Sequence, residues 1–152
     1  MEKTTFGAGC FWGIEHAFNK IDGVIGAPVG YAGGTVPDPT YEQVCTGQTG
    51  HTEVVQVEFD PEKVTYEELL ETFWTLHDPT TLNRQGPDFG TQYRSAIYFH
   101  SPEQEAAAHK AIAALEEGNQ LRNPIVTEVA PIDTFYIGED YHQRYFEKKG
   151  HY

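Results

Sequence analysis

The spacing of hydrophobic positions changes along this 152-residue chain, and the changes predict a mixture of helices and strands. In Phe11–Ile21 apolar residues recur every three or four positions, which is typical of a helix with one buried face. In Thr52–Phe59 they alternate instead, so Val55, Val57 and Phe59 share one face of a strand.

Capping and turn residues place the remaining elements. A capping box of Thr65 and Glu68 starts a helix over about Tyr66–Leu76. Ser101 followed by proline starts an Ala-rich helix that stops at Gly118. The other expected segments are strands at Thr4–Gly9, Val24–Ala32, Ser95–His100 and Ile125–Ile132, a helical turn at Tyr41–Thr46, a long loop at Asp78–Gly90 and an aromatic, helix-compatible tail at Tyr136–Phe146.

The intermingling of strands and helices without a strict βαβ repeat predicts an α+β fold. We expect a two-layer sandwich with a central mixed sheet and flanking helices, a ferredoxin-like variant. The chain length favours a single domain over residues 1–152.

Charge narrows the range of partners. The chain carries 10 Lys and Arg against 23 Asp and Glu, a net charge of −13, which argues against nucleic acid or anionic lipid as the main partner. Mean hydropathy is −0.51, and no apolar run is long enough to span a membrane. The first residues lack the apolar stretch of a signal peptide, and two cysteines are no disulfide framework, so a reduced, cytoplasmic protein is expected.

Cys10 is the first candidate for chemistry. It lies where a predicted strand gives way to a helix, between Gly9 and Gly13. Backbone N–H groups and the helix dipole favour a thiolate at such a position, so we expect a depressed pKa and a reactive sulfur. A buried cysteine that only fills space is the competing interpretation.

Glu53 is the second candidate. Counting by two, it lies on the strand face of Val55 and Val57, which should be buried. A buried carboxyl has a raised pKa, which suits a general acid near neutral pH. Alternatively, Glu53 reaches water from the beginning of its strand.

Aromatic and polar side chains supply further candidates. Trp12 lies off the apolar helix stripe and suits a pocket wall, whereas Phe11 fits the core as well. Tyr41 and Tyr93 adjoin loops and carry hydroxyl donors. Asp88, His142 and Tyr145 are candidates for the site on the same grounds. The histidines and cysteines lack metal-ligand spacing, so no metal site is expected.

Six motifs in a fixed order extend over almost the whole chain. They are Gly9–Gly13 (GCFWG), Gly30–Gly34 (GYAGG), Tyr41–Cys45 (YEQVC), Gly50–Val55 (GHTEVV), Asp88–Ser95 (DFGTQYRS) and Tyr141–Gln143 with Tyr145. In these motifs the chain resembles the peptide methionine sulfoxide reductase A family. The resemblance implies an enzyme, a peptide-methionine (S)-S-oxide reductase, that reduces the S epimer of free or protein-bound methionine sulfoxide through a cysteine sulfenic acid.

The same resemblance implies roles for the candidate residues. Cys10 attacks the sulfoxide sulfur, Glu53 supplies a proton, and Tyr41 and Tyr93 hydrogen-bond the sulfoxide oxygen. Substrate binding is expected from Phe11, Trp12, Asp88, His142 and Tyr145.

One departure concerns recycling of the sulfenic acid. Many family members carry resolving cysteines in a C-terminal tail, but no cysteine follows Cys45 here. The family position of Cys45 is usually structural, and a buried, inert thiol is expected. The resemblance thus implies a one-cysteine enzyme, expected to be a monomer without a prosthetic cofactor, reduced by thioredoxin, glutaredoxin or glutathione. A disulfide between Cys10 and Cys45 is the alternative.

Two other classes of function are weighed against this one. A thiol peroxidase also uses a helix-start cysteine, but the Thr and Arg that typically surround its thiolate are missing near Cys10 in sequence. A sulfoxide-binding module without turnover would not need Cys10, Glu53, Tyr41 and Tyr93 together.

Overall fold

The computed structural model describes residues 2–85, 88–118, 124–143 and 145. The helices are α1 (Phe11–Asn19), α2 (Tyr41–Cys45), α3 (Tyr66–Leu76) and α4 (Pro102–Glu117), with 3-10 turns η1 (Thr91–Tyr93) and η2 (Asp140–His142). The strands are β1 (Glu2–Ala8), β2 (Val24–Gly26), β3 (Val29–Ala32), β4 (Thr52–Phe59), β5 (Arg84–Gln85), β6 (Asp88–Phe89), β7 (Ser95–Phe99), β8 (Glu128–Pro131) and β9 (Tyr136–Ile137).

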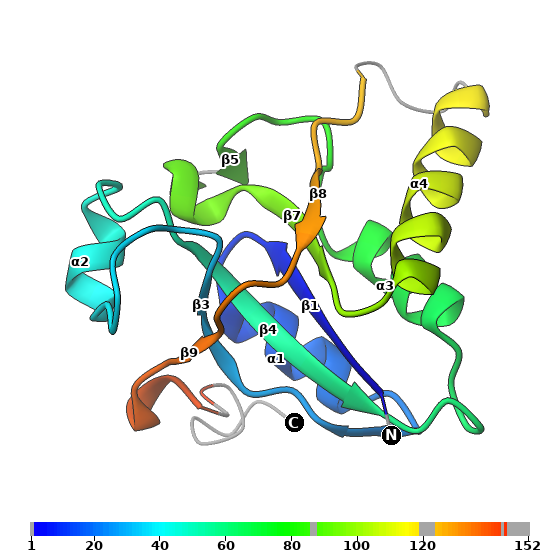
Figure 1. The fold of residues 1–152 in the computed structure, drawn as a ribbon, viewed down its shortest axis with the longest axis horizontal. Coiled ribbons are helices and arrows are strands. Elements are labelled where there is room, and N and C mark those ends of the chain that lie inside the picture. Colours follow the sequence, from blue (N-terminus) through cyan, green and yellow to red (C-terminus); the bar gives the residue numbers. More distant parts are fainter. Residues whose placement is uncertain (1, 86–87, 119–123, 144, 146–152) are drawn as a thin grey trace.

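Within the described residues the main sheet runs in the order β8-β7-β1-β4-β3-β9, with β2 paired to β4 (Figure 1). β1, β3, β4 and β7 pair antiparallel, and β8 adds a parallel partner to β7. The succession β1-α1-β3-β4-α3-β7 is the β-α-β-β-α-β arrangement of ferredoxin-like folds. The predicted α+β fold with a mixed sheet is therefore confirmed.

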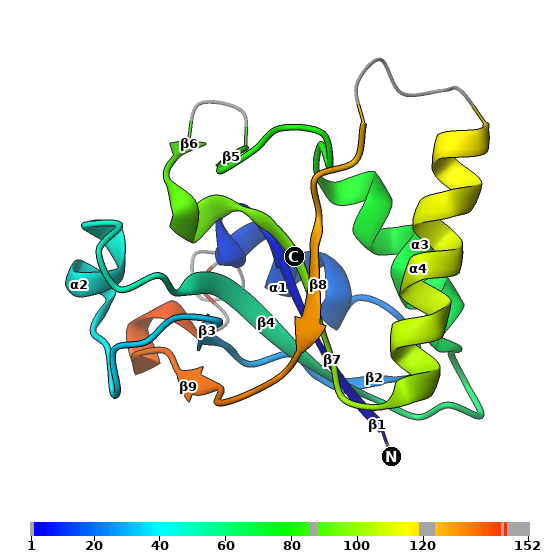
Figure 2. The same ribbon diagram turned by 45° about the horizontal axis from the view of Figure 1, so that its top comes forward.

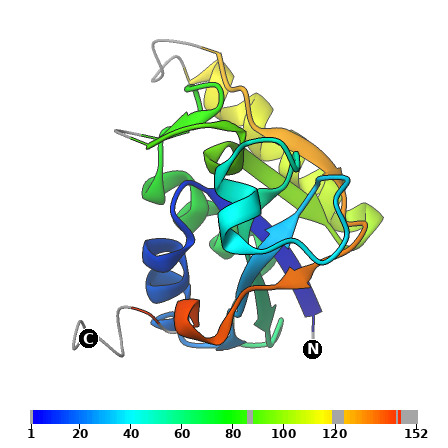
Figure 3. The same ribbon diagram turned by 90° about the vertical axis from the view of Figure 1, so that its left-hand side faces the viewer.

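The helices cover one face of the sheet. Phe11 and Phe18 of α1 and Phe73 of α3 join the inward side chains of the central strands in one core. On the other face, Val54 and Tyr98 pack under the connection between β8 and β9. Figure 3 shows α1 and this connection on opposite sides of the sheet, and Figure 2 shows α3 and α4 next to each other.

Local signals set the helix starts as predicted. Thr65 and Glu68 form the predicted capping box at α3. Thr40 and Gln43 form a second capping box, which was not predicted, at α2. The Ser101 hydroxyl accepts a hydrogen bond from the amide of Gln104 at the start of α4.

Three expectations about elements need correction. The strand expected at Val24–Ala32 is two strands, interrupted at Pro28, which lacks the N–H a continuous ladder needs. The loop Asp78–Gly90 contains the short pair β5–β6. The tail forms β9 and the turn η2 rather than one helix, and its end at Phe146 lies outside the described residues.

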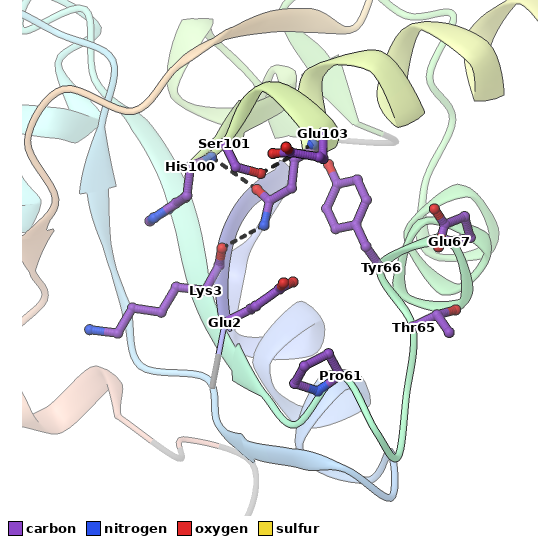
Figure 4. A pocket seen from close by; sticks show the side chains of 10 residues that line it. Glu2, Lys3, Pro61, Thr65, Tyr66, Glu67, His100, Ser101 and Glu103 are labelled. Carbon is purple, nitrogen blue, oxygen red and sulfur yellow. Dashed lines mark hydrogen bonds between the residues drawn. The ribbon is translucent and has the colours of Figure 1, made fainter.

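Figure 4 shows a pocket between the start of β1, the loop before α3 and the start of α4. The side chain of Gln104 crosses it, accepting from the amide of His100 and donating to the carbonyl of Lys3. None of its lining residues belongs to the predicted site. None of the helices in the described part of the chain is long and apolar enough to cross a membrane.

Candidate active site

Cys10 lies at the junction of β1 and α1, as the sequence predicts. β1 ends at Ala8, Gly9 turns the chain with φ +94°, and Cys10 is the N-cap residue of α1. A Cβ atom at Gly9 would stand only 3.0 Å from the Cβ of Gln85, so a side chain there meets both backbone strain and β5. The sharp turn and the close approach explain the glycine.

The expected depression of the Cys10 pKa is wrong. Burial raises the pKa of the thiol to about 11, and the negative charges of Glu53 and Asp88 act in the same direction. The amides of Trp12 and Gly13 at the start of α1 lower it, as the helix-start argument requires, but they are outweighed. The free protein therefore holds Cys10 mainly as the thiol.

Glu53 is enclosed, as predicted. It is 1% exposed and points to the helical face of β4, and its Oε1 accepts a hydrogen bond from the amide of Phe11 at 3.3 Å. Its Oε2 is buried and has no hydrogen-bond partner in the described part of the chain. Burial raises the pKa of Glu53 to about 8, and the charge of Asp88 adds to the rise. The carboxyl group is thus protonated at neutral pH.

The Cys10 thiol and the Glu53 carboxyl group influence each other's ionisation electrostatically. Because ionised Glu53 raises the pKa of Cys10, a protonated Glu53 makes the thiol easier to ionise. A single protonation of Glu53 therefore provides a proton donor and favours the thiolate next to it.

Tyr41 and Tyr93 come to the same place from different elements. Tyr41 is the first residue of α2, and Tyr93 is the last residue of η1. Burial raises both pKa values, that of Tyr93 to about 12, and the charge of Glu53 contributes to both shifts. Both hydroxyl groups stay protonated and can donate hydrogen bonds near Glu53 and Cys10.

Cys45 departs from expectation, since it is exposed rather than buried. Desolvation nevertheless raises the pKa of its thiol, while hydrogen bonding with the hydroxyl groups of Tyr41 and Tyr93 opposes the rise. The charge of Cys45 also acts on Tyr93, as does that of Cys10. Both thiols of the chain therefore lie near the tyrosine pair.

Aromatic rings form the wall beside Cys10. Trp12 stacks on Tyr145, with ring centroids 3.9 Å apart and planes inclined by 10°. Its indole N–H donates to Nδ1 of His142 at 3.0 Å, and His142 in turn packs on Tyr41 with centroids 4.4 Å apart. Burial lowers the pKa of His142, which keeps the accepting Nδ1 free of a proton.

Two of the residues expected to bind substrate are closed off from solvent. Phe11 is 1% exposed and His142 is fully buried, whereas Trp12, Tyr145 and Asp88 are partly accessible. Phe11 packs on Tyr41 and His142 from behind. In this arrangement Phe11 and His142 pack behind the aromatic wall, and Trp12 and Tyr145 form its solvent-accessible surface.

Glu139 was missed by the sequence analysis. Its carboxylate accepts hydrogen bonds from the hydroxyl of Tyr31 and from the amide of Tyr41. The one available signal was an acid two residues before the Tyr141–Gln143 motif. The described residues contain no group of three His, Cys, Asp or Glu side chains able to hold a metal ion.

Comparison with known proteins places this geometry in context. Residues 2–152 match the family model described as peptide methionine sulfoxide reductase. A curated relative from Methanosarcina acetivorans, peptide methionine sulfoxide reductase MsrA, is 59% identical over 99% of this chain and 80% of its own length.

Solved structures agree with the family match. Methionine sulfoxide reductase A of Corynebacterium diphtheriae superposes with a TM-score of 0.87 at 42% identity, covering 98% of this chain and 75% of that one. Mxr1 from Saccharomyces cerevisiae in complex with Trx2 superposes with a TM-score of 0.61 at 30% identity, covering 95% and 84%.

Proposed function

This chain belongs to the peptide methionine sulfoxide reductase family, and from that premise we propose that Cys10 is the nucleophile of its reaction. The enzyme reduces methionine sulfoxide to methionine, with thiols as the reductant. The observation that carries the assignment of residues is that Cys10, at the start of α1, lies close enough to a buried Glu53 for its charge to act on the thiol, while the pKa of Glu53 is raised to about 8.

The proposed step transfers one oxygen atom. The Cys10 sulfur bonds to the sulfoxide sulfur while the sulfoxide oxygen takes the proton of Glu53. The hydroxyl group then moves from the methionine sulfur to the Cys10 sulfur: the sulfur–oxygen bond of the sulfoxide and the new sulfur–sulfur bond break, and a sulfur–oxygen bond forms on Cys10. Methionine leaves with the electron pair, and Cys10 is left as a sulfenic acid. The methionine sulfur is reduced by two electrons and the cysteine sulfur is oxidised by two, while the proton of the thiol restores Glu53.

The tyrosine pair stabilises the oxygen during this step. The hydroxyl groups of Tyr41 and Tyr93 lie close enough to Glu53 for its charge to raise their pKa values. Protonated phenols in that position donate to the negative charge that develops on the sulfoxide oxygen. Asp88, near both Cys10 and Glu53, suits the polar end of the substrate.

The test of this function uses both epimers of methionine sulfoxide with dithiothreitol as reductant. We expect turnover of the S epimer, as the family resemblance implies, and none of the R epimer. Faster consumption of hydrogen peroxide than of either sulfoxide would favour the peroxidase alternative. Tight binding without turnover would favour a binding module.

Replacing Trp12 tests the methyl pocket. Trp12→Ala is expected to raise KM roughly tenfold for dimethyl sulfoxide and methionine sulfoxide alike, because both present a methyl group to the ring. Trp12→Phe is the matched control, since it keeps an aromatic wall, although a smaller one, and loses the N–H that bonds His142. If only the larger substrate is affected, the indole contacts the amino-acid portion instead.

Recycling of the sulfenic acid is proposed to use an external thiol in a reducing compartment. Although Cys45 is exposed, desolvation raises the pKa of its thiol, so little of it is present as the thiolate that would attack the sulfenic acid. Cys10 is partly exposed, so a small thiol or a thiol protein can reach it. The Mxr1 complex with Trx2 supports thioredoxin as such a partner, with glutaredoxin and glutathione as alternatives.

A thiol count tests the recycling route. After one equivalent of methionine sulfoxide without reductant, we expect a trappable sulfenic acid at Cys10 and a Cys45 that is still alkylated after unfolding. Loss of both thiols as an intramolecular disulfide, abolished by Cys45→Ser, would show that Cys45 resolves the sulfenic acid.

A further inference from the structure

Glu139 joins three separate segments of the chain around the candidate site. Its Oε1 accepts a hydrogen bond from the hydroxyl of Tyr31 at 2.8 Å. Its Oε2 accepts from the amide of Tyr41 at 2.9 Å and, at 3.4 Å, from the hydroxyl of Tyr141. One carboxylate thus connects β3, the start of α2 and the turn η2.

The backbone that carries Glu139 is itself fixed to the sheet. The amide of Gly138 donates to the carbonyl of Val29 at 2.8 Å, next to the pairing of β9 with β3 (Figure 1). The side chain of Gln143 accepts from the amide of Val29 and donates to its carbonyl, both at 2.9 Å. Glu139 therefore projects from an anchored segment, and its partner Tyr31 is fully buried in β3.

On the other side, Glu139 holds the start of a short helix, whose Val44 is buried in the core. α2 has five residues, too few to be stable alone. Its capping box satisfies the amide of Gln43, and Glu139 satisfies the amide of Tyr41, the first residue of the helix. At the other end, the side-chain amide of Gln92 donates to the carbonyl of Cys45 at 3.4 Å. The direction of the Tyr41 phenol depends on where α2 is held.

Glu139 is ionised, in contrast to Glu53. Desolvation acts to raise the pKa of Glu139, but the hydrogen bonds from Tyr41 and Tyr31 outweigh it and leave the pKa lowered. A carboxylate offers only acceptors and so matches all three donors, whereas protonation would turn one of its oxygens into a donor.

We propose that Glu139 is a positioning residue: its carboxylate anchors the Tyr41 amide to the sheet and so aims the Tyr41 hydroxyl at the sulfoxide oxygen. This proposal rests on the role proposed for Tyr41 in the reaction. In this proposal Glu139 makes no contact with the substrate. It acts through the placement of α2.

The test compares Glu139→Leu with Glu139→Gln, using the S epimer and dithiothreitol. Leucine keeps the approximate size and removes every acceptor, and we expect kcat to fall roughly 10- to 100-fold with a smaller change in KM. Glutamine can accept from the Tyr41 amide and donate to the Tyr31 hydroxyl, so it should restore most of the activity. Glu42→Leu, which removes an exposed acid from the first turn of α2, is the matched control and should leave kcat unchanged.

A double-mutant cycle with Tyr41→Phe separates positioning from a general structural effect. In the Tyr41→Phe background, Glu139→Leu should cost less than about twofold, because the hydroxyl to be positioned is already gone. Additive losses, or a Glu139→Leu variant as active as the wild type, would overturn the proposal. If Glu139→Leu does not fold, Tyr31→Phe, which removes one anchor of the carboxylate, replaces it in the same cycle.

Hydrogen exchange at the Tyr41 amide provides a readout that does not depend on activity. We expect faster exchange in Glu139→Leu and nearly unchanged exchange in Glu139→Gln, and equal exchange in all three proteins would refute the anchor. If Tyr41→Phe alone keeps full activity, the role proposed for Tyr41 fails, while the exchange experiment still decides whether Glu139 anchors α2.

Discussion

Cys10→Ser is expected to reduce turnover of methionine sulfoxide to less than about one hundredth of the wild-type rate. A serine hydroxyl ionises far less readily than a thiol and cannot form a sulfenic acid, so both the attack and the oxygen transfer are lost. The substitution changes one atom at an N-cap position, where serine is well tolerated, so the fold should persist. Steady-state kinetics and thermal unfolding of the variant check both points.

The second cysteine provides the control for this experiment. Cys45→Ser keeps a hydroxyl able to bond Tyr41 and Tyr93, and with dithiothreitol it should retain activity close to wild type. Residual activity above about one hundredth in Cys10→Ser would be hard to reconcile with covalent catalysis at this position. Loss of activity in Cys45→Ser instead would identify Cys45, in α2, as the essential thiol.

Glu53→Gln should lower kcat by roughly 10²- to 10⁴-fold, because the amide keeps the size of the side chain but has no acidic proton to give. Asp88→Asn is a useful comparison, since it removes a charge that acts on both Cys10 and Glu53 without removing the proposed proton donor. A Glu53→Gln variant with nearly full kcat would assign the proton to another group, with the tyrosine pair as the remaining donors.

The pH dependence gives the Glu53 variant a specific signature. In the wild type, we expect kcat/KM to rise with pH as Cys10 ionises and to level off near pH 8, where loss of the Glu53 proton begins to offset the gain in thiolate. In Glu53→Gln this levelling near pH 8 should disappear and the rise should continue. An unchanged profile would show that Glu53 does not titrate in the reaction.

As pH rises toward 8, the stability of the folded protein should fall while kcat/KM rises. The pKa of Glu53 is higher in the folded protein, about 8, than its ordinary value of 4.5, so the folded state holds a proton that the unfolded state releases between these values. The free energy of unfolding contributed by this group is full below pH 4.5 and is lost as pH rises through 8. Glu53→Gln should remove that slope, at most about 1.4 kcal/mol per pH unit, and denaturant unfolding at several pH values measures it.

The sequence by itself determines the features that depend on local spacing. Alternation along Thr52–Phe59 is sufficient to place Glu53 on the buried face of β4, because successive side chains of a strand point to opposite sides. The capping box at Thr65 and the strand-to-helix turn at Cys10 are equally local, and both are found where the sequence predicts them.

Only the tertiary structure decides the properties that sum over distant residues. A helix start lowers the pKa of Cys10, yet burial and two acids from β4 and β6 raise it, and no local pattern gives that balance. The exposure of Cys45 depends on the position of α2 in the fold. Glu139 hydrogen-bonds to Tyr31 and Tyr41 only because β9, which precedes it, pairs with β3. Desolvation and hydrogen-bond partnership depend on every atom nearby, whichever part of the chain supplies it, so they follow from packing rather than from sequence spacing.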